Sequence, residues 1–327
     1  MPSRWRTLLC AAGVAVAAVI AAKMWTTPRK GPWKPLWQPP SVPKLVKGRS
    51  YFFLTHHKTG TNLMQRFCNI TAIASTGWTD ECAFCLRGQR PVKGKEHLGI
   101  GCLPDPTPEH GKLRGTIDRF TLLSSIHGRE AHLILQFHKD FRAVHMIRHP
   151  VAMAISAHQY NKFVSSPQGK KWRWDMSAQD IENATTLREE LLIEAKAIQR
   201  PIDDMITAHE LMKDDPRVLT LDLDHHFEET FNATAERLFR HMFADAPGDI
   251  EFHIATASFH DKRGWTKKQQ QQPGATAGPR FLMNRTSAIL EWKKLEEEGH
   301  PDVLKVLSFA EQLGYPREWT PVKGPRD

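Results

Sequence analysis

A lysine, a single glycine and several small polar residues follow an apolar run near the start of the chain, in the stretch YFFLTHHKTGTN from Tyr51 to Asn62. The apolar run predicts a buried strand, and the residues after the turn predict a helix. A turn of this kind directs backbone N–H groups and the positive end of a helix dipole at one point. Lys58 adds a positive charge there, and Gly60 lets the backbone approach a ligand closely. Further donors come from Thr59, Thr61 and Asn62.

This turn differs from the cradle that binds nucleoside triphosphates. The pattern G-x-x-x-x-G-K-[ST] is absent, the lysine precedes the glycine, and the loop is shorter. A shorter loop suits one phosphate-like group better than a β/γ-phosphate pair with magnesium. The alternative is an ordinary strand–helix turn with a surface lysine.

A second stretch, FRAVHMIRHPVAMAIS from 141 to 156, carries another pair of anion ligands. Arg148 lies at the end of a predicted strand, and Ser156 follows eight residues later inside the next predicted helix. An arginine and a serine so placed can hold a second phosphate.

The elements that must position these residues alternate along the chain. Strands are expected at 50–56, 119–128, 141–150 and 217–224. Helices are expected at 61–74, 131–140, 151–163, 186–214 with a kink at Pro201, 227–243, 286–298 and 301–314. The segment 77–116, rich in Gly, Pro and Cys, shows no clear period. Strands separated by helices predict an α/β fold with a parallel sheet covered on both faces.

Taken together, the two stretches resemble the superfamily of sulfotransferases that use 3′-phosphoadenosine 5′-phosphosulfate (PAPS). HHKTGTNLM matches the family pattern P-K-[ST]-G-T-[TN]-x-[LM], except that His57 replaces the proline. RHPVAMAIS matches the arginine–serine pattern, with His149 in the place of Asn or Asp. The stretch VLTLDLDHHFEETFNATAERLFRHMF has the shape of the third family landmark, a strand that ends in an acidic residue before a helix. The resemblance spans roughly 50 to 315 and is closer to the membrane-bound carbohydrate branch.

The resemblance implies a three-layer, P-loop-like fold, PAPS as the sulfuryl donor and no metal. It assigns the 5′-phosphosulfate to Lys58, Thr59, Gly60, Thr61 and Asn62, and the 3′-phosphate to Arg148 and Ser156. A basic C-terminal loop of the family corresponds best to Lys262, Arg263 and Gly264, in competition with Lys267, Lys268 and Arg280.

Sulfuryl transfer also needs a base for the acceptor hydroxyl, while Lys58 neutralises the charge that grows on the leaving nucleotide. His127 ends a predicted strand 21 residues before Arg148. The resemblance makes it the first candidate, because the catalytic histidine of the cytosolic branch ends the corresponding strand at nearly that distance. Glu130 is the carboxylate alternative. The other histidines considered near the site are His56, His57, His138, His225 and His226.

Charge and composition narrow the class of partner. Lys plus Arg exceed Asp plus Glu by 45 − 36 = 9, which fits either a solvated surface or an anionic ligand. The sequence holds no long basic run, so nucleic acid is not expected. The pair of cysteines in CAFC lacks a second metal-binding pair at matching spacing, so zinc is not expected either.

The first 49 residues predict a membrane anchor and a stem. Residues 1–6 form a short basic tail, Thr7–Ala22 carries no charge over 16 residues, and 7–25 is read as a signal-anchor helix. Residues 26–49 are a proline-rich stem, 50–318 the catalytic domain and 319–327 a tail. This layout predicts a single-pass type II protein of the Golgi membrane with its catalytic domain in the lumen. A cleaved signal peptide or a transit peptide is the alternative.

Cysteines and sequons fit an oxidising compartment. Cys68, Cys82, Cys85 and Cys102 allow two disulfides in three pairings. Sequons lie at Asn69, Asn183, Asn232 and Asn284.

The sequence therefore predicts a sulfotransferase whose acceptor is a hydroxyl, with a glycan as the leading class. The alternatives are a small-molecule kinase with a P-loop and a catalytically inactive binding protein of the same fold.

Overall fold

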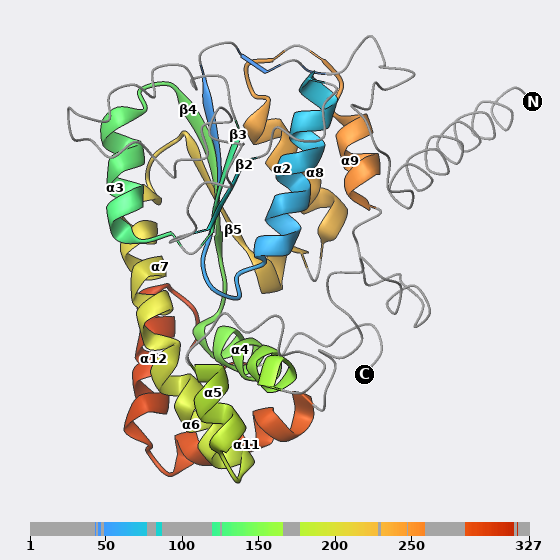
Figure 1. Cartoon of the computed structure of the whole chain (residues 1–327). Coiled ribbons are helices and arrows are strands. Elements are labelled where there is room, and N and C mark those ends of the chain that lie inside the picture. The colour runs from blue at the N-terminus through green and yellow to red at the C-terminus, as the bar shows by residue number, and fades with distance from the viewer. Residues whose placement is uncertain are drawn as a thin grey trace, which may run out of the picture.

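The computed structural model describes residues 43, 45–46, 49–76, 83–86, 120–124, 126–165, 177–227, 230–246, 248–258, 285–316 and 319 (Figure 1). The expected anchor at 7–25, nearly all of the stem and the loop with Arg263 and Gly264 lie outside these residues. Among the helices that are described, none is long and apolar enough to span a membrane.

Within the described residues, five parallel strands form the central sheet. They are β1 (Ser50–Thr55), β2 (Ala83–Leu86), β3 (Phe120–Ser124), β4 (Phe141–Ile147) and β5 (Val218–Asp222), in the spatial order β2-β3-β1-β4-β5. Every residue of β1 is buried, because β1 lies between β3 and β4 and both faces of the sheet are covered.

Helices cover the two faces of the sheet (Figure 1). Tyr51 and Phe53 of β1 pack in one core with α2 (Thr61–Thr76), α8 (Phe231–Met242) and α9 (Glu251–Ser258). Phe52 and Leu54 point to the opposite face, against α3 (Gly128–Phe137) and α7 (Gln199–Met212). The expected fold class, a parallel sheet flanked by helices, is confirmed.

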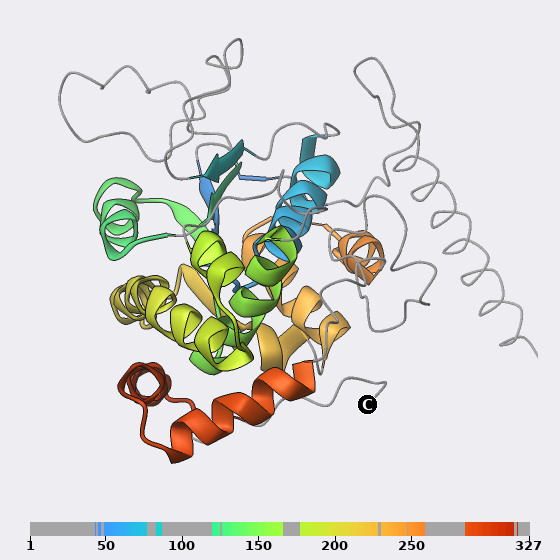
Figure 2. The ribbon, with the colours of Figure 1, turned by 60° about the horizontal axis from the view of Figure 1, so that its bottom comes forward.

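A further group of helices lies below the carboxyl ends of the strands. It consists of α4 (Pro150–Ser165), α5 (Ser177–Asn183), α6 (Leu187–Ala197), α11 (Arg285–Glu297) and α12 (Pro301–Gln312). Figure 2, in which the bottom of Figure 1 comes forward, shows this layer in front of the sheet. Its own core joins the start of α4 to α6, α7, α11 and α12.

At the carboxyl ends of the strands, the connections that leave β1 and β3 run to opposite faces of the sheet. The connection that leaves β1 runs through α2 on one face, whereas the connection from β3 to β4 runs through α3 on the other. Loops that diverge in this way open a crevice at the carboxyl ends of the strands. The turns after β1, β3 and β4 all lie at this edge, because the three strands are parallel neighbours.

Several elements differ from the sequence-based expectation, which contained neither α5 nor α9. β2 lies in the segment 77–116, where no period was visible, because it is a four-residue edge strand. The long helix expected at 186–214 is two helices, α6 and α7, that divide at Ile198. Pro201 is tolerated in the first turn of α7, where backbone N–H groups have no partner within the helix, so it follows the break and does not kink a continuous helix. β5 ends at Asp222 and is followed by η4 (Leu223–Phe227), a π-helical turn.

Two of the buried histidines, His145 and His253, lie in the layers around the sheet. His145 of β4 is 0% exposed, and its Nε2 lies 2.8 Å from Nε2 of His56. His253 of α9 is also 0% exposed and packs between the rings of Phe239 and Phe243. Neither ring nitrogen of His253 has a hydrogen-bond partner among the described residues. Burial lowers the pKa of His145 to about 3 and that of His253 to about 4.

These buried histidines predict acid-labile folding. Above pH 6.5 the two side chains are neutral in both the folded and the unfolded chain, so they give no pH dependence. Below pH 6.5 the unfolded chain binds protons that the folded chain excludes. The free energy of unfolding should therefore fall, by on the order of 1 kcal/mol per pH unit for each histidine, until the pH reaches the folded pKa values. Urea unfolding between pH 7.5 and 4.5 measures the slope. His253→Phe should flatten it, and a wild-type stability that is constant over this range would contradict the prediction.

Candidate functional site

The turn from His56 to Gly60 is tightly closed on itself. The hydroxyl of Thr59 accepts a hydrogen bond from the backbone N–H of His56 (2.7 Å) and donates one to the His56 carbonyl (3.0 Å). Lys58 has φ 63° and is the one non-glycine residue with positive φ in the part of the chain that the structure describes. Strained backbone of this kind is typical of functional sites, and residues with left-handed φ direct successive N–H groups into a concave anion site.

Both the backbone conformation and a neighbouring side chain favour glycine at position 60. Its φ is 93°, and a Cβ atom there would lie 3.1 Å from Cδ1 of Leu223 in η4. α2 begins at the next residue, so the turn opens directly onto a helix N-terminus. Thr61 is half-buried and Asn62 exposed at this end of the helix. Oγ1 of Thr61 lies 3.1 Å from Oγ1 of Thr55.

The ammonium group of Lys58 lies over an aromatic ring. Its Nζ atom lies 3.3 Å from the ring centroid of Tyr160 on α4. A cation on the face of an aromatic ring is stabilised there but stays available to a stronger anionic partner. Ser156 precedes Tyr160 by four residues, so it shares that face of α4 and is half-buried.

Arg148 directly contacts the turn. Its Nη1 atom donates a hydrogen bond to the carbonyl of Lys58 (3.1 Å). Its Nε atom lies 3.0 and 3.2 Å from the two carboxylate oxygens of Asp224, and Nη2 lies 3.0 Å from the nearer one. The stretch that contains Lys58 and the stretch that contains Arg148 therefore form one site, and Asp224 neutralises the Arg148 guanidinium within it.

Of the candidate bases, His127 and Glu130 are adjacent. His127 precedes α3, and its backbone N–H donates to Oε2 of Glu130 (2.8 Å). The Glu130 carboxylate thus caps the helix. Nδ1 of His127 pairs with Oδ2 of Asp204 on α7. The backbone N–H of Ile126 donates to the carbonyl of Thr55 (3.0 Å), which places His127 beside the start of the turn.

The remaining histidines that the sequence analysis named differ in burial and in their contacts. His56 is buried against His145, and burial holds its pKa well below the usual range. His138 contacts Ser50 Oγ (3.0 Å) and the ring of Phe52, which is a packing role. His57 is half-buried and His225 is exposed, whereas the side chain of His226 lies outside the described residues.

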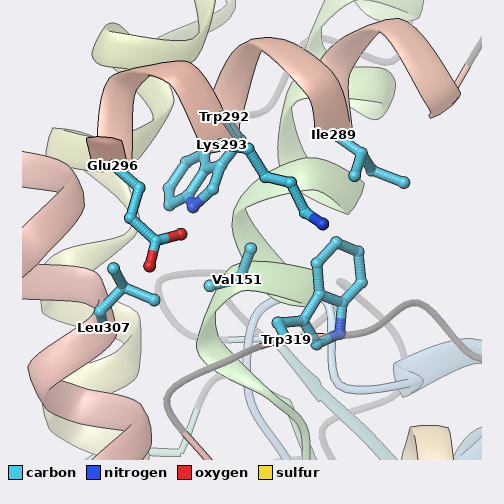
Figure 3. Close-up of a pocket in the computed structure, with 7 residues that line it drawn as sticks. All are labelled: Val151, Ile289, Trp292, Lys293, Glu296, Leu307 and Trp319. Atoms are coloured by element: carbon cyan, nitrogen blue, oxygen red, sulfur yellow. The ribbon is translucent and has the colours of Figure 1, made fainter. Parts of the chain in front are cut away.

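A small pocket lies between the start of α4, α11, α12 and Trp319 (Figure 3). It is lined by Val151, Ile289, Trp292, Lys293, Glu296, Leu307 and Trp319. The Trp319 ring also lies 6.1 Å from the ring of His149. None of the residues that the sequence assigns to anion binding lines this pocket.

Sequence reasoning missed three of these partners. Tyr160, Asp204 and Asp224 each touch a residue that the motifs singled out. Asp224 did carry a signal, because it falls in the acidic strand end of the third family landmark. Tyr160 and Asp204 lie in ordinary helical sequence, where nothing distinguishes them. Elsewhere, Arg263 and Gly264 lie outside the described residues. Within the described segments, no cluster of His, Cys, Asp and Glu is arranged to hold a metal ion.

Comparison with solved structures finds several matching chains, one of which is described below. No protein-family model matches the chain, and no curated protein matches its sequence. The crystal structure of mouse sulfotransferase SULT7A1 complexed with PAP aligns over 82% of this chain and 90% of that chain, with 12% identity and a TM-score of 0.44. A similarity this low carries no conclusion about function.

Proposed function

We propose that this chain is a sulfotransferase that moves the sulfuryl group of PAPS to a hydroxyl acceptor. The observation that carries the proposal is the 3.1 Å hydrogen bond from Arg148 to the carbonyl of Lys58, which unites the two anion-binding motifs at one edge of the sheet. A nucleotide with phosphates at both ends of its ribose needs two such groups near each other. The turn fits the 5′ end, because its amides, Gly60 and the start of α2 leave the backbone accessible to an anion.

Each residue has a separate task in this reaction. In the displacement, a new bond forms between the acceptor oxygen and sulfur as the bond from sulfur to the 5′-phosphate oxygen breaks. Lys58 and the turn amides stabilise the negative charge that grows on that phosphate. Arg148 and Ser156 hold the 3′-phosphate, and Arg148 must exchange Asp224 for it. His127 takes the proton of the acceptor hydroxyl.

Stabilisation by a bound nucleotide tests whether PAPS is the sulfuryl donor. Saturating 3′-phosphoadenosine 5′-phosphate (PAP) should raise the melting temperature by about 5 °C, since a ligand at 100 times its Kd adds about 2.7 kcal/mol to the folded state. ATP with magnesium should give no comparable shift. A shift with ATP and magnesium alone would favour a kinase, and no shift with either would favour a binding protein of the same fold.

For the acceptor we propose a glycan hydroxyl. Support comes from the similarity of HMIRHP to the membrane-bound carbohydrate branch and from the basic balance of the chain. Transfer of radiolabel from ³⁵S-PAPS to a glycan panel, and not to tyrosine peptides, lipids or small metabolites, is the expected result. Labelling of another class alone would reassign the acceptor.

We also propose that the domain faces the Golgi lumen behind an N-terminal anchor. Cys68 is disulfide-bonded, which supports an oxidising compartment, and Asn183 and Asn232 are exposed sequon residues. Protein expressed in a eukaryotic cell should stay in membranes after alkaline extraction and shift on N-glycosidase treatment. A soluble, unglycosylated product would contradict the proposal.

A further inference from the structure

The backbone around His127 is held from two sides. The Ile126 amide is bonded to the Thr55 carbonyl, and the His127 amide is bonded to the Glu130 carboxylate. Both bonds fix where the residue leaves β3 and enters α3. Both bonds act on the backbone, whereas a side-chain contact orients the ring nitrogens.

That contact comes from α7. Oδ2 of Asp204 pairs with Nδ1 of His127, and the two side chains are 16% and 22% exposed. A carboxylate at Nδ1 keeps the proton of a neutral imidazole on that nitrogen, because an ionised carboxylate only accepts hydrogen bonds. Nε2 then carries the lone pair, and it is Nε2 that can accept a proton from an acceptor hydroxyl.

A glycine beside His127 makes this contact possible. A Cβ atom on Gly128 would lie only 2.2 Å from Cγ2 of Thr207 and 3.0 Å from its Cβ. The Thr207 hydroxyl donates to the carbonyl of Asp203 (2.9 Å), which leaves its methyl group toward α3. Thr207 lies one turn after Asp204, so the close approach of α3 at Gly128 brings His127 within reach of the carboxylate.

A surface ion pair without function is the simpler alternative. Such pairs contribute about 0–1 kcal/mol to stability, and many contribute nothing measurable. That alternative accounts for the pair alone. It does not account for a helix start where a Cβ atom next to the histidine would lie 2.2 Å from Cγ2 of Thr207 and would force a shift.

We propose that Asp204 is a positioning residue for His127, with Gly128 as the contact that admits it; this inference rests on the proposed function. The acceptor proton passes to Nε2 of His127 as the oxygen–sulfur bond forms, and the electron pair of the breaking sulfur–oxygen bond stays on the 5′-phosphate. Asp204 stabilises the resulting imidazolium. It touches neither the acceptor nor the nucleotide.

The tautomer of His127 gives a test that does not depend on activity. In ¹⁵N-labelled protein, with the His127 signals assigned through His127→Gln, the neutral ring should carry its proton on Nδ1. Asp204→Asn should move the proton to Nε2 and lower kcat by at least about 100-fold, the size of a general-base contribution. The KM for PAPS and the Kd for PAP should stay within about twofold. A tautomer or a kcat unchanged in this variant overturns the proposal.

Three further variants test whether Asp204 and Gly128 position His127. Asp203→Asn alters an exposed carboxylate at the neighbouring position of α7 and should change neither readout. Gly128→Ala should reproduce the tautomer change of Asp204→Asn, and Gly128→Ala with Thr207→Ser should recover part of kcat, because the 2.2 Å contact is then relieved. If the wild type transfers no sulfuryl group, the proposed function fails, while the ¹⁵N spectra still decide whether Asp204 orders His127.

Discussion

Replacement of Lys58 by alanine is expected to lower kcat by about 10²–10⁴-fold while the protein stays folded. The reason is electrostatic: the side chain places a positive charge where the 5′-phosphate becomes more negative as the sulfuryl group leaves, and losing one such stabilising group costs about 10²–10³ in rate or more. Alanine also carries a Cβ atom, so it keeps the same backbone strain at φ 63° and adds none. The contact with Tyr160 is lost, which costs about 1 kcal/mol at an exposed site.

Steady-state kinetics with saturating PAPS measure this loss, with thermal unfolding as the check on folding. Lys139→Ala is the matched control, because Lys139 is exposed at the opposite edge of the sheet, just before β4 begins. Lys58→Arg should recover part of the rate because it restores a positive charge. If Lys58→Ala turned over at the wild-type rate, the turn would not be the donor site.

Removal of Arg148 is expected to have the largest effect on stability. Arg148→Ala leaves Asp224, which is 5% exposed, as a buried carboxylate without its ion-pair partner. Breaking one side of a buried pair typically costs about 3–5 kcal/mol, whereas removing both sides is often neutral. The double variant Arg148→Ala with Asp224→Ala should therefore unfold closer to the wild type than Arg148→Ala does. Urea unfolding of the four proteins of this cycle gives the coupling energy.

The double variant also allows a clean test of binding. If Arg148 holds the 3′-phosphate, wild-type protein should bind PAP more tightly than 5′-AMP, which lacks that phosphate, and the double variant should lose the preference. Asp224→Asn keeps the arginine and removes the competing charge, so it should strengthen PAP binding selectively. Calorimetry that finds the same PAP preference in the wild type and the double variant would place the 3′-phosphate elsewhere.

The fold was largely predictable because its signals are local. The apolar runs of β1, β4 and β5 and the helical patterns of α2, α4 and α8 each show in one short stretch of sequence. β2 was missed, since four residues at an edge do not establish a period. The division of α6 from α7 at Ile198 was also missed, because the apolar stripe continues across it and only packing decides where the backbone turns.

Only one part of the candidate site, the turn, could be predicted from the sequence. The strand–turn–helix at Lys58 and Gly60 can be read from its residues, since an apolar run, a glycine and a helical pattern follow one another directly. The residues that contact this turn from other elements could not be predicted from the sequence. Arg148 and Asp224 are 76 positions apart, and their pairing depends on where β4 and η4 end.

By itself, the sequence determined four of the five parallel strands, most of the covering helices and the residues of the turn, because hydrophobic period and turn chemistry act over a few neighbouring residues. Only the tertiary structure decided that Arg148 meets the turn, that Asp224 neutralises it and that Asp204 reaches His127. Those contacts join elements distant in sequence. They depend on the packing of whole helices and strands, down to the missing side chain at Gly128.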